Sequence, residues 1–107
     1  MSELDFTICC TVTFFSKKRR TPPNLNNGKY CPHFVIKGSE QLLGVNFIDG
    51  EDVIFDKQIG ANALPLHETV DYSALQAGTE FLIMESGNIV GEGIVKEIFQ
   101  HKPHGRK

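Results

Sequence analysis

The sequence predicts an all-β protein of roughly six or seven short strands, arranged as a barrel or a sandwich. Short apolar runs recur along the chain between turn residues, and no stretch has the apolar spacing of a helix. Two apolar runs also flank Ser86-Gly87-Asn88 within the segment Gly78–Phe99, which is the typical pattern of a β-hairpin. The 107 residues suffice for one modest core, so we expect one domain over residues 1–100 and a basic, disordered tail over residues 101–107.

The first expected strand, Phe6–Phe15, alternates between apolar and polar residues with a period of two. Thr, Val, Ile and Phe in this pattern are typical of a half-buried antiparallel strand. The segment Ser16–Pro32 follows without periodicity and contains charges, Pro22-Pro23, asparagines and a glycine. We therefore expect a long loop there, and a loop of this length in a small domain is commonly functional or disordered.

The middle of the chain predicts short elements with irregular connections. Pro65 lies inside one expected strand and indicates an edge position or a bulge, because proline cannot donate to a strand ladder. Gly91-Glu92-Gly93 lies inside the last expected strand, where glycines indicate a bend, a bulge or a close approach of two backbones. The expected elements before the hairpin are strands over Phe34–Lys37 and Leu42–Ile48, a turn over Asp49–Asp52, a short apolar run over Val53–Phe55, a strand over Ala61–Thr69 and one helical turn over Asp71–Leu75.

Charges are separated along the chain, although the formal net charge is only −2. The run Lys17–Arg20 is one basic cluster, and the tail carries three further cations. Between His33 and Glu97, eleven acidic residues stand against three lysines, a formal balance of −8. Such a separation of sign can steer a ligand of opposite charge to one side of the molecule.

The cysteines and the first residues of the sequence favour a reducing cytoplasm. Cys9, Cys10 and Cys31 are an odd number, and adjacent residues on a strand point to opposite faces, so we expect no disulfide framework. The segment MSELDFT lacks the basic and then apolar pattern of a secretory signal. No apolar run approaches the roughly 20 residues that a membrane-spanning helix needs. We therefore expect a cytoplasmic protein with no membrane partner.

Two motifs carry a resemblance to a known family. Thr21-Pro22, followed by the segment Gly28–Phe34 (GKYCPHF), stands where that family has Thr-Pro and then Gly-Tyr-Arg-Pro-Gln-Phe. The segment Phe81–Val95 (FLIMESGNIVGEGIV) follows the family's hairpin, F-A-I-R-E-G-G-x-T-V-G-x-G-V-V, nearly position for position. Over most of its length the chain thus resembles the C-terminal barrel domain of translation elongation factor Tu. The resemblance implies that the fold is a single antiparallel β-barrel of about six strands. In that family the domain helps to hold the T-stem of aminoacyl-tRNA.

The chain departs from the family at several points. In the first motif, His33 replaces the glutamine, and the arginine is lost around Tyr30-Cys31, where the chain has a one-residue insertion. In the hairpin, Met84 replaces the arginine. The sequence also lacks the Gly-x-x-x-x-Gly-Lys-Ser/Thr loop that cradles nucleotide phosphates in a GTPase domain. We therefore expect a barrel that binds no nucleotide and hydrolyses no GTP.

Candidate catalytic and metal-ligating residues form no strong motif. Cys31-Pro32-His33 is at most half of a zinc-binding unit, and His101 and His104 lie in the expected tail. Cys31 and His33 would share a face of an extended segment, and His67 next to Glu68 is a second candidate pair. Catalysis also requires that such a pair and a substrate meet in space, which spacing in the sequence does not determine. We therefore expect no metal, no cofactor and no enzymatic activity, and an enzyme with a cryptic site is the third-ranked function.

The expected loop over Ser16–Pro32, which contains the basic run Lys17–Arg20, is the strongest candidate for a functional site. Lysine and arginine neutralise phosphates, and aromatic rings stack on bases. We expect non-catalytic binding of RNA, such as tRNA, or of a translation-associated protein. The residues expected to carry this function are Lys17, Lys18, Arg19, Arg20 and Lys29, with Tyr30 and His33 as secondary contacts.

The acidic part of the chain between His33 and Glu97, here called the acidic body, supports an alternative function. A negative face steers a cationic partner by complementary charge. The alternative is therefore a protein–protein inhibitor of the immunity type, or a regulatory module, whose partner is a basic, toxin-like protein.

Overall fold

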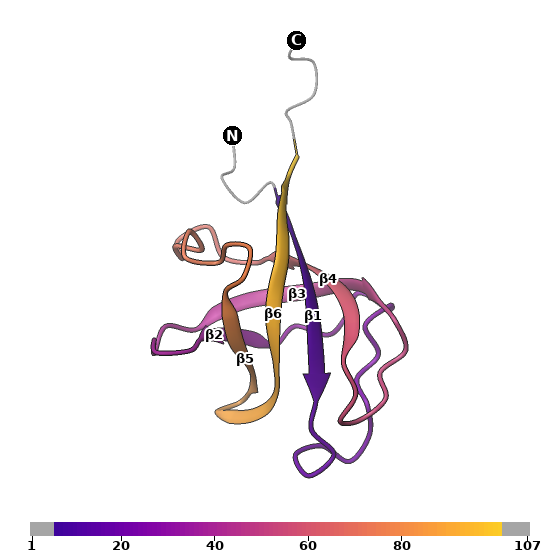
Figure 1. The fold of residues 1–107 in the computed structure, drawn as a ribbon. Helices are drawn as coiled ribbons and strands as arrows, with labels where there is room; N and C mark the ends of the chain where they lie inside the picture. The colour runs from indigo at the N-terminus through magenta and orange to yellow at the C-terminus, as the bar shows by residue number, and fades with distance from the viewer. Residues whose placement is uncertain (1–5, 102–107) are drawn as a thin grey trace.

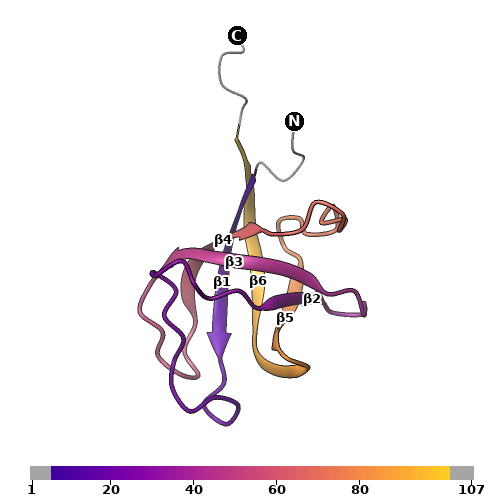
Figure 2. The same cartoon turned by 180° about the vertical axis from the view of Figure 1, so that it is seen from behind.

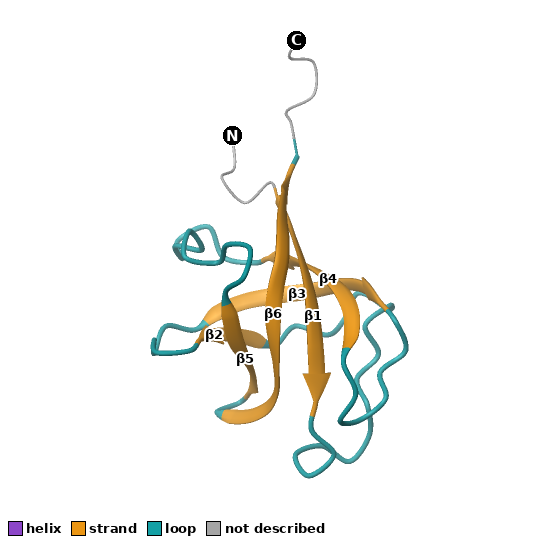
Figure 3. Cartoon of the chain, in the orientation of Figure 1, coloured by secondary structure: helices purple, strands orange, loops and turns teal. Residues whose placement is uncertain are grey.

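Six strands form a closed antiparallel barrel in the computed structural model of the protein, which describes residues 6–101. The strands are β1 (Phe6–Phe14), β2 (His33–Ile36), β3 (Leu43–Gly50), β4 (Ile59–Pro65), β5 (Glu80–Glu85) and β6 (Asn88–Gln100). Around the barrel they follow the order β1-β4-β3-β2-β5-β6 (Figure 1, Figure 2). The described residues contain no helix, so the prediction of an all-β barrel of about six strands is confirmed (Figure 3). In particular, the described part of the chain offers no helix of the length and apolarity needed to cross a membrane.

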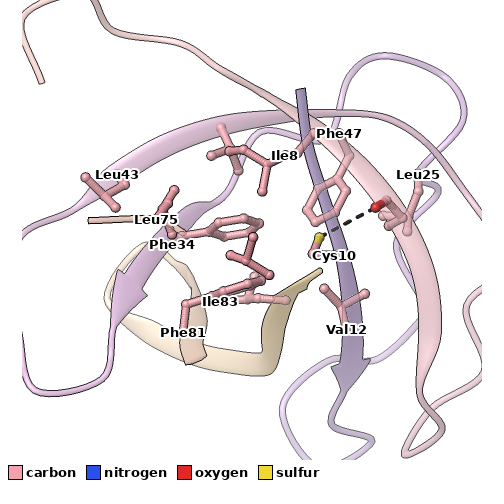
Figure 4. Close-up of a cluster of buried hydrophobic side chains, with 14 of the residues drawn as sticks. Ile8, Cys10, Val12, Leu25, Phe34, Leu43, Phe47, Leu75, Phe81 and Ile83 are labelled. Carbon is pink, nitrogen blue, oxygen red and sulfur yellow. Dashed lines mark hydrogen bonds between the residues drawn. The ribbon is translucent and has the colours of Figure 1, made fainter. Parts of the chain in front are cut away.

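The period-two pattern of β1 becomes an alternation of buried and partly exposed side chains along the whole strand. Its inner face, with Ile8 and Cys10, packs against a group of aromatic rings (Figure 4). The rings of Phe34 and Phe81 stack with their centroids 4.0 Å apart, and Phe47 packs edge-on to Phe34 at 5.8 Å. Burial of these rings supplies much of the apolar surface that the core removes from water.

The hairpin of β5 and β6 closes at Ser86 and Gly87. Both residues have positive φ, 49° and 85°, as a two-residue type I′ turn requires. Asn88 pairs with Glu85 and is therefore the first residue of β6. The expected hairpin is confirmed, with a turn one residue shorter than the segment Ser86-Gly87-Asn88.

The two glycines of the last strand mark a close approach of β6 to β1. A Cβ atom on Gly91 would lie 2.5 Å from the carbonyl oxygen of Thr13, and one on Gly93 would lie 2.6 Å from that of Thr11. Any larger side chain would separate the two strands at the seam where the barrel closes. The prediction of a close backbone approach is confirmed.

The expected turn over Asp49–Asp52 is wrong in its first half. Asp49 and Gly50 continue β3 and pair with β4. The register shifts between Phe47 and Asp49, so Ile48 is the extra residue of a β-bulge, and its side chain is 37% exposed. The bulge lets the strand bend and continue past the point where the sequence indicates a turn.

The expected strand over Ala61–Thr69 is shifted. The observed β4 begins at Ile59 and ends at Pro65, which is buried and pairs with Val45. The Leu66 N–H still donates to the Gly44 carbonyl of β3 at 3.1 Å. The N–H groups of Leu66 and His67 both also donate to the hydroxyl oxygen of Tyr72, at 3.2 Å. The expected helical turn over Asp71–Leu75 is a single hydrogen-bonded turn, closed by the Leu75 N–H and the Tyr72 carbonyl at 2.9 Å.

Little of the expected tail falls within the described residues. His101 is described, and its Nε2 lies 2.8 Å from the Thr7 Oγ1. Residues 102–107 lie outside the described part of the chain, and with them most of the predicted disordered tail.

Candidate functional site

The segment of residues 16–32, here called the basic loop, is packed onto the barrel at several points. Its Leu25 is buried, and an added Cβ on Gly50 would lie 2.7 Å from the Leu25 side chain. The side chain of Asn26 bonds both backbone groups of Gly50: its Nδ2 donates to the carbonyl at 3.0 Å and its Oδ1 accepts from the N–H at 3.2 Å. These contacts fix the outer part of the loop against the end of β3.

The last residues of the basic loop run beside β3 as an extension of β2. The N–H groups of Val45 and Phe47 donate to the carbonyls of Pro32 and Tyr30, at 3.1 and 3.0 Å. The Nδ2 of Asn46 also donates to the Gly28 carbonyl at 3.1 Å. The loop is therefore anchored at both its middle and its end.

The first half of the basic loop is held by a charged cluster, here called the Arg19–Glu85–Tyr30 cluster. The Arg19 Nε donates to Glu85 Oε2 at 2.7 Å, and the Tyr30 hydroxyl donates to the same oxygen. A second guanidinium nitrogen of Arg19 donates to the Thr21 carbonyl. The side chains of Arg19 and Glu85 are only 22% and 29% exposed, so solvent screens this pair less than a surface ion pair. Glu85 thus ties two points of the loop to the end of β5.

The Tyr30 ring is in contact with an aromatic ring and with a guanidinium group. The ring stacks on Phe47 with centroids 5.6 Å apart, and the Arg19 guanidinium lies 5.4 Å from its centroid. Burial, followed by the hydrogen bond to the Glu85 carboxylate, raises the pKa of the Tyr30 hydroxyl above its usual value. The hydroxyl therefore stays protonated as a donor, and the ring supports the loop from within the molecule.

The remaining cations of the predicted site point to solvent. Lys17, Lys18, Arg20 and Lys29 are all exposed, and none of them has an ion-pair partner among residues 6–101. Lys17 and Lys18 lie in a turn that the Lys18 N–H closes on the Phe15 carbonyl at 3.1 Å. This half of the predicted site is thus an exposed group of positive charges on an anchored loop.

His33, the last residue of the predicted site, lies apart from the charged turn. It begins β2, is half-buried, and pairs with Gly44 on one side and Met84 on the other. The ring of His67 covers Gly44, since an added Cβ there would meet two atoms of that ring at 2.6 and 2.7 Å. The structure therefore groups His33 with His67 and not with the lysines.

The described structure brings His33 and His67 to the same glycine but forms no metal site from the candidate residues. Across residues 6–101, no group of three or more His, Cys, Asp or Glu side chains is placed to hold a metal ion. Cys31 is exposed and its Sγ accepts from Asn46 Nδ2 at 3.1 Å. Cys10 is buried in the core, and its thiol lies 3.6 Å from the Ala61 carbonyl.

The thiols are expected to differ sharply in reactivity. Burial raises the pKa of Cys10 to about 12, so its reactive thiolate is scarce at pH 8, whereas Cys31 is open to solvent. Brief treatment with iodoacetamide, read by peptide mass spectrometry, should label Cys31 and leave Cys10 unmodified. Unfolding in urea should make Cys10 as reactive as Cys31. Equal labelling of the two in the folded protein would contradict the described core.

A cleft of about 920 Å³ lies at the other end of the barrel. Figure 1 shows the basic loop below the end of β1 and the 66–79 segment above β5, beside the upper part of β6. The cleft lies between that segment and β6. Its described lining residues include Phe6, Val70, Tyr72, Leu75 and Ile98.

No protein-family model matches this chain, and no curated protein sequence matches it either. The structure itself shows a small closed six-stranded antiparallel barrel.

Sequence reasoning missed two features of these sites. Glu85 is an ordinary acidic residue next to a turn, and nothing local indicates that it would meet Arg19, which is 66 positions away. The cleft depends on the different lengths of β5 and β6, which the hairpin pattern does not define.

Proposed function

We propose that the protein is a non-catalytic binding module that contacts RNA through the exposed cations of the basic loop. The observation that carries the proposal is that the cations of one basic run have different environments. Arg19 anchors the loop by pairing with Glu85, whereas its neighbours Lys17, Lys18 and Arg20 are exposed. A phosphate backbone gains most from cations that are positioned before it binds, because less side-chain and loop entropy is then lost.

Several carboxylates of the acidic body already have partners within the protein, so they are less available to a binding partner than the exposed cations of the basic loop. Glu80 and Glu92 both pair with Lys37, at 3.2 and 3.3 Å, and Glu85 pairs with Arg19. Asp49 accepts a hydrogen bond from the Asn62 side chain at 2.7 Å. These internal contacts favour the basic loop over the acidic body as the working surface.

The resemblance of the hairpin and the Gly28–Phe34 segment to elongation factor Tu supports a structured RNA such as tRNA as the ligand. The free thiols of Cys9, Cys10 and Cys31 support a reducing compartment, and we propose the cytoplasm.

The proposal is tested by the salt dependence of tRNA binding. Each lysine that neutralises a phosphate contributes ~0.7–0.9 to the slope of log K against log salt concentration. The variant Lys17→Ala/Lys18→Ala should therefore lower that slope by about 1.5 and weaken binding about tenfold at moderate salt. Fluorescence anisotropy with a labelled tRNA measures both quantities.

The control is Lys96→Glu, which changes the net charge by the same amount at the cleft end of the barrel. It should leave the slope unchanged. If both variants lose the same affinity, RNA senses only total charge and the basic loop is not the site. If neither loses affinity, or if the parent protein binds no RNA, the proposal is wrong.

A further inference from the structure

The last strand of the barrel is longer than the strand beside it. β5 pairs with β6 only as far as Glu80 and Ile94. Beyond that point the final backbone bonds are those of Val95, to Thr79 and Gly78, at 2.9 and 2.8 Å. β6 nevertheless continues to Gln100, held by β1 along its other edge.

Among residues 6–101, the upper part of β6, Lys96–Gln100, therefore has a free edge. Within the described residues, no backbone hydrogen bond joins it to the 66–79 segment across the cleft. A strand exposes alternate N–H and C=O groups along each edge, and an unpaired edge is a template for another strand. Lys96 is the extra residue of a β-bulge opposite Cys9 and Cys10, so the regular part of the free edge is Glu97–Gln100. At ~3.3 Å per residue this part is about 13 Å long, enough for a peptide of four residues.

The cleft beside this edge has an apolar floor. Its most buried lining residues are Phe6, Tyr72 and Leu75, whose exposed fractions are 8% or less. The half-buried Ile98 lies in the lining with them. The rings of Phe6 and Tyr72 meet edge-on at 6.2 Å. A volume of about 920 Å³ leaves room for several side chains to enter.

The rim of the cleft is mostly acidic. Glu68, Asp71 and Glu97 lie in its lining, and Lys96 is the one cation among the described lining residues. The Asp71 carboxylate accepts the Ser73 N–H at 2.9 Å, which lowers its pKa, so this carboxylate is charged at neutral pH. The rim therefore favours a positively charged occupant.

We propose that the cleft binds an extended basic segment of a partner protein, which adds a strand to the free edge of β6. Alternate residues of the segment place apolar side chains on the floor at Phe6 and Leu75, and the intervening lysines or arginines face the rim. The free edge favours a peptide over a small organic cation, because only a peptide pairs with a row of backbone groups. The site lies at the opposite end of the barrel from the basic loop, so the inference goes beyond the proposed RNA contact and does not depend on it (Figure 1).

The probe for the test is a fluorescein-labelled peptide of alternating lysine and valine, with anisotropy measured on the full chain. We expect it to bind, and we expect Glu68→Lys/Glu97→Lys to weaken binding about tenfold by turning attraction into repulsion. The matched control is Glu40→Lys/Asp52→Lys, which reverses two exposed carboxylates outside the cleft lining and should leave the affinity unchanged. Equal weakening by both variants would show binding to the acidic body in general and would overturn the proposal.

Backbone pairing is tested with two N-methylated forms of the probe. One carries N-methyl groups at the odd positions and the other at the even positions, so each blocks one edge of the peptide as a strand. Strand addition requires that one form lose binding and the other keep it. If both forms bind like the parent peptide, the cleft takes the probe without strand pairing, and the proposal fails.

Three further results would also overturn the proposal. The first is failure of the unmodified probe to bind. The second is binding by a variant that ends at His101 but not by the full chain, which would assign the cleft to the chain's own residues 102–107. The third is a dimer, in sedimentation, that Glu97→Lys dissociates, which would assign the cleft to a second copy.

Discussion

Replacing Gly93 with alanine should destabilise the barrel by about 3 kcal/mol, as expected for overpacking against atoms that have no room to move. The new Cβ would lie 2.6 Å from the Thr11 carbonyl oxygen and 2.6 Å from the Phe81 ring. The Phe81 ring is fully buried and stacked on Phe34, so it has no free space to rotate into. The alternative is to separate β6 from β1, which breaks the seam. Urea unfolding followed by fluorescence or circular dichroism measures the loss.

The matched control is Gly60→Ala in β4. A Cβ at Gly60 meets nothing within 4 Å, so alanine there should be neutral or slightly stabilising. A similar loss in the two variants would mean that any glycine-to-alanine change in a strand is harmful here. The close approach of β6 to β1 would then not be the cause.

Replacing Glu85 with alanine should destabilise the protein by about 2 kcal/mol, because it leaves two partly buried donors without their acceptor. The Arg19 guanidinium loses its ion pair, and the Tyr30 hydroxyl loses its hydrogen bond. The basic loop should also open. Trypsin should then cleave between residues 17 and 20 much faster than in the parent protein, since proteases cut mobile segments.

The control for this change is Glu80→Ala, which removes a glutamate from the other end of β5. Glu80 pairs with Lys37, but the two side chains are 57% and 45% exposed, so the loss of stability should be much smaller than that of Glu85→Ala. Cleavage of the basic loop should not change. A Glu85 variant whose stability and trypsin pattern match those of the Glu80 variant would show that the Arg19–Glu85–Tyr30 cluster does not hold the loop.

The parts of the fold that sequence predicts well are those whose pattern is local. The alternation in β1 and the Ser86-Gly87 turn are both determined by neighbouring residues, and both are confirmed. The ends of β3 and β4 depend on contacts between distant segments. Ile48 becomes a bulge only because β4 pairs on both sides of it, and Pro65 ends a strand whose partner is β3. Local rules for turns and prolines cannot represent such contacts.

The candidate site shows the same limit. The charge cluster at Lys17–Arg20 is evident from the sequence, but its members are equivalent there. The structure separates them, because Arg19 reaches Glu85 while its neighbours are exposed. Whether a basic residue is structural or available depends on a partner that is remote in the sequence, so spacing alone cannot decide it.

The seam between β1 and β6 has a consequence for how the protein is made. The Thr7–His101 contact links residues 94 positions apart, and β1 depends on β6 for one complete edge. During synthesis on the ribosome, β1 emerges early and must wait for β6 before the barrel closes. Contacts of such long range make folding slow, and the waiting edge is prone to aggregate. The nascent chain is therefore expected to be exposed to aggregation until β6 has emerged from the ribosome.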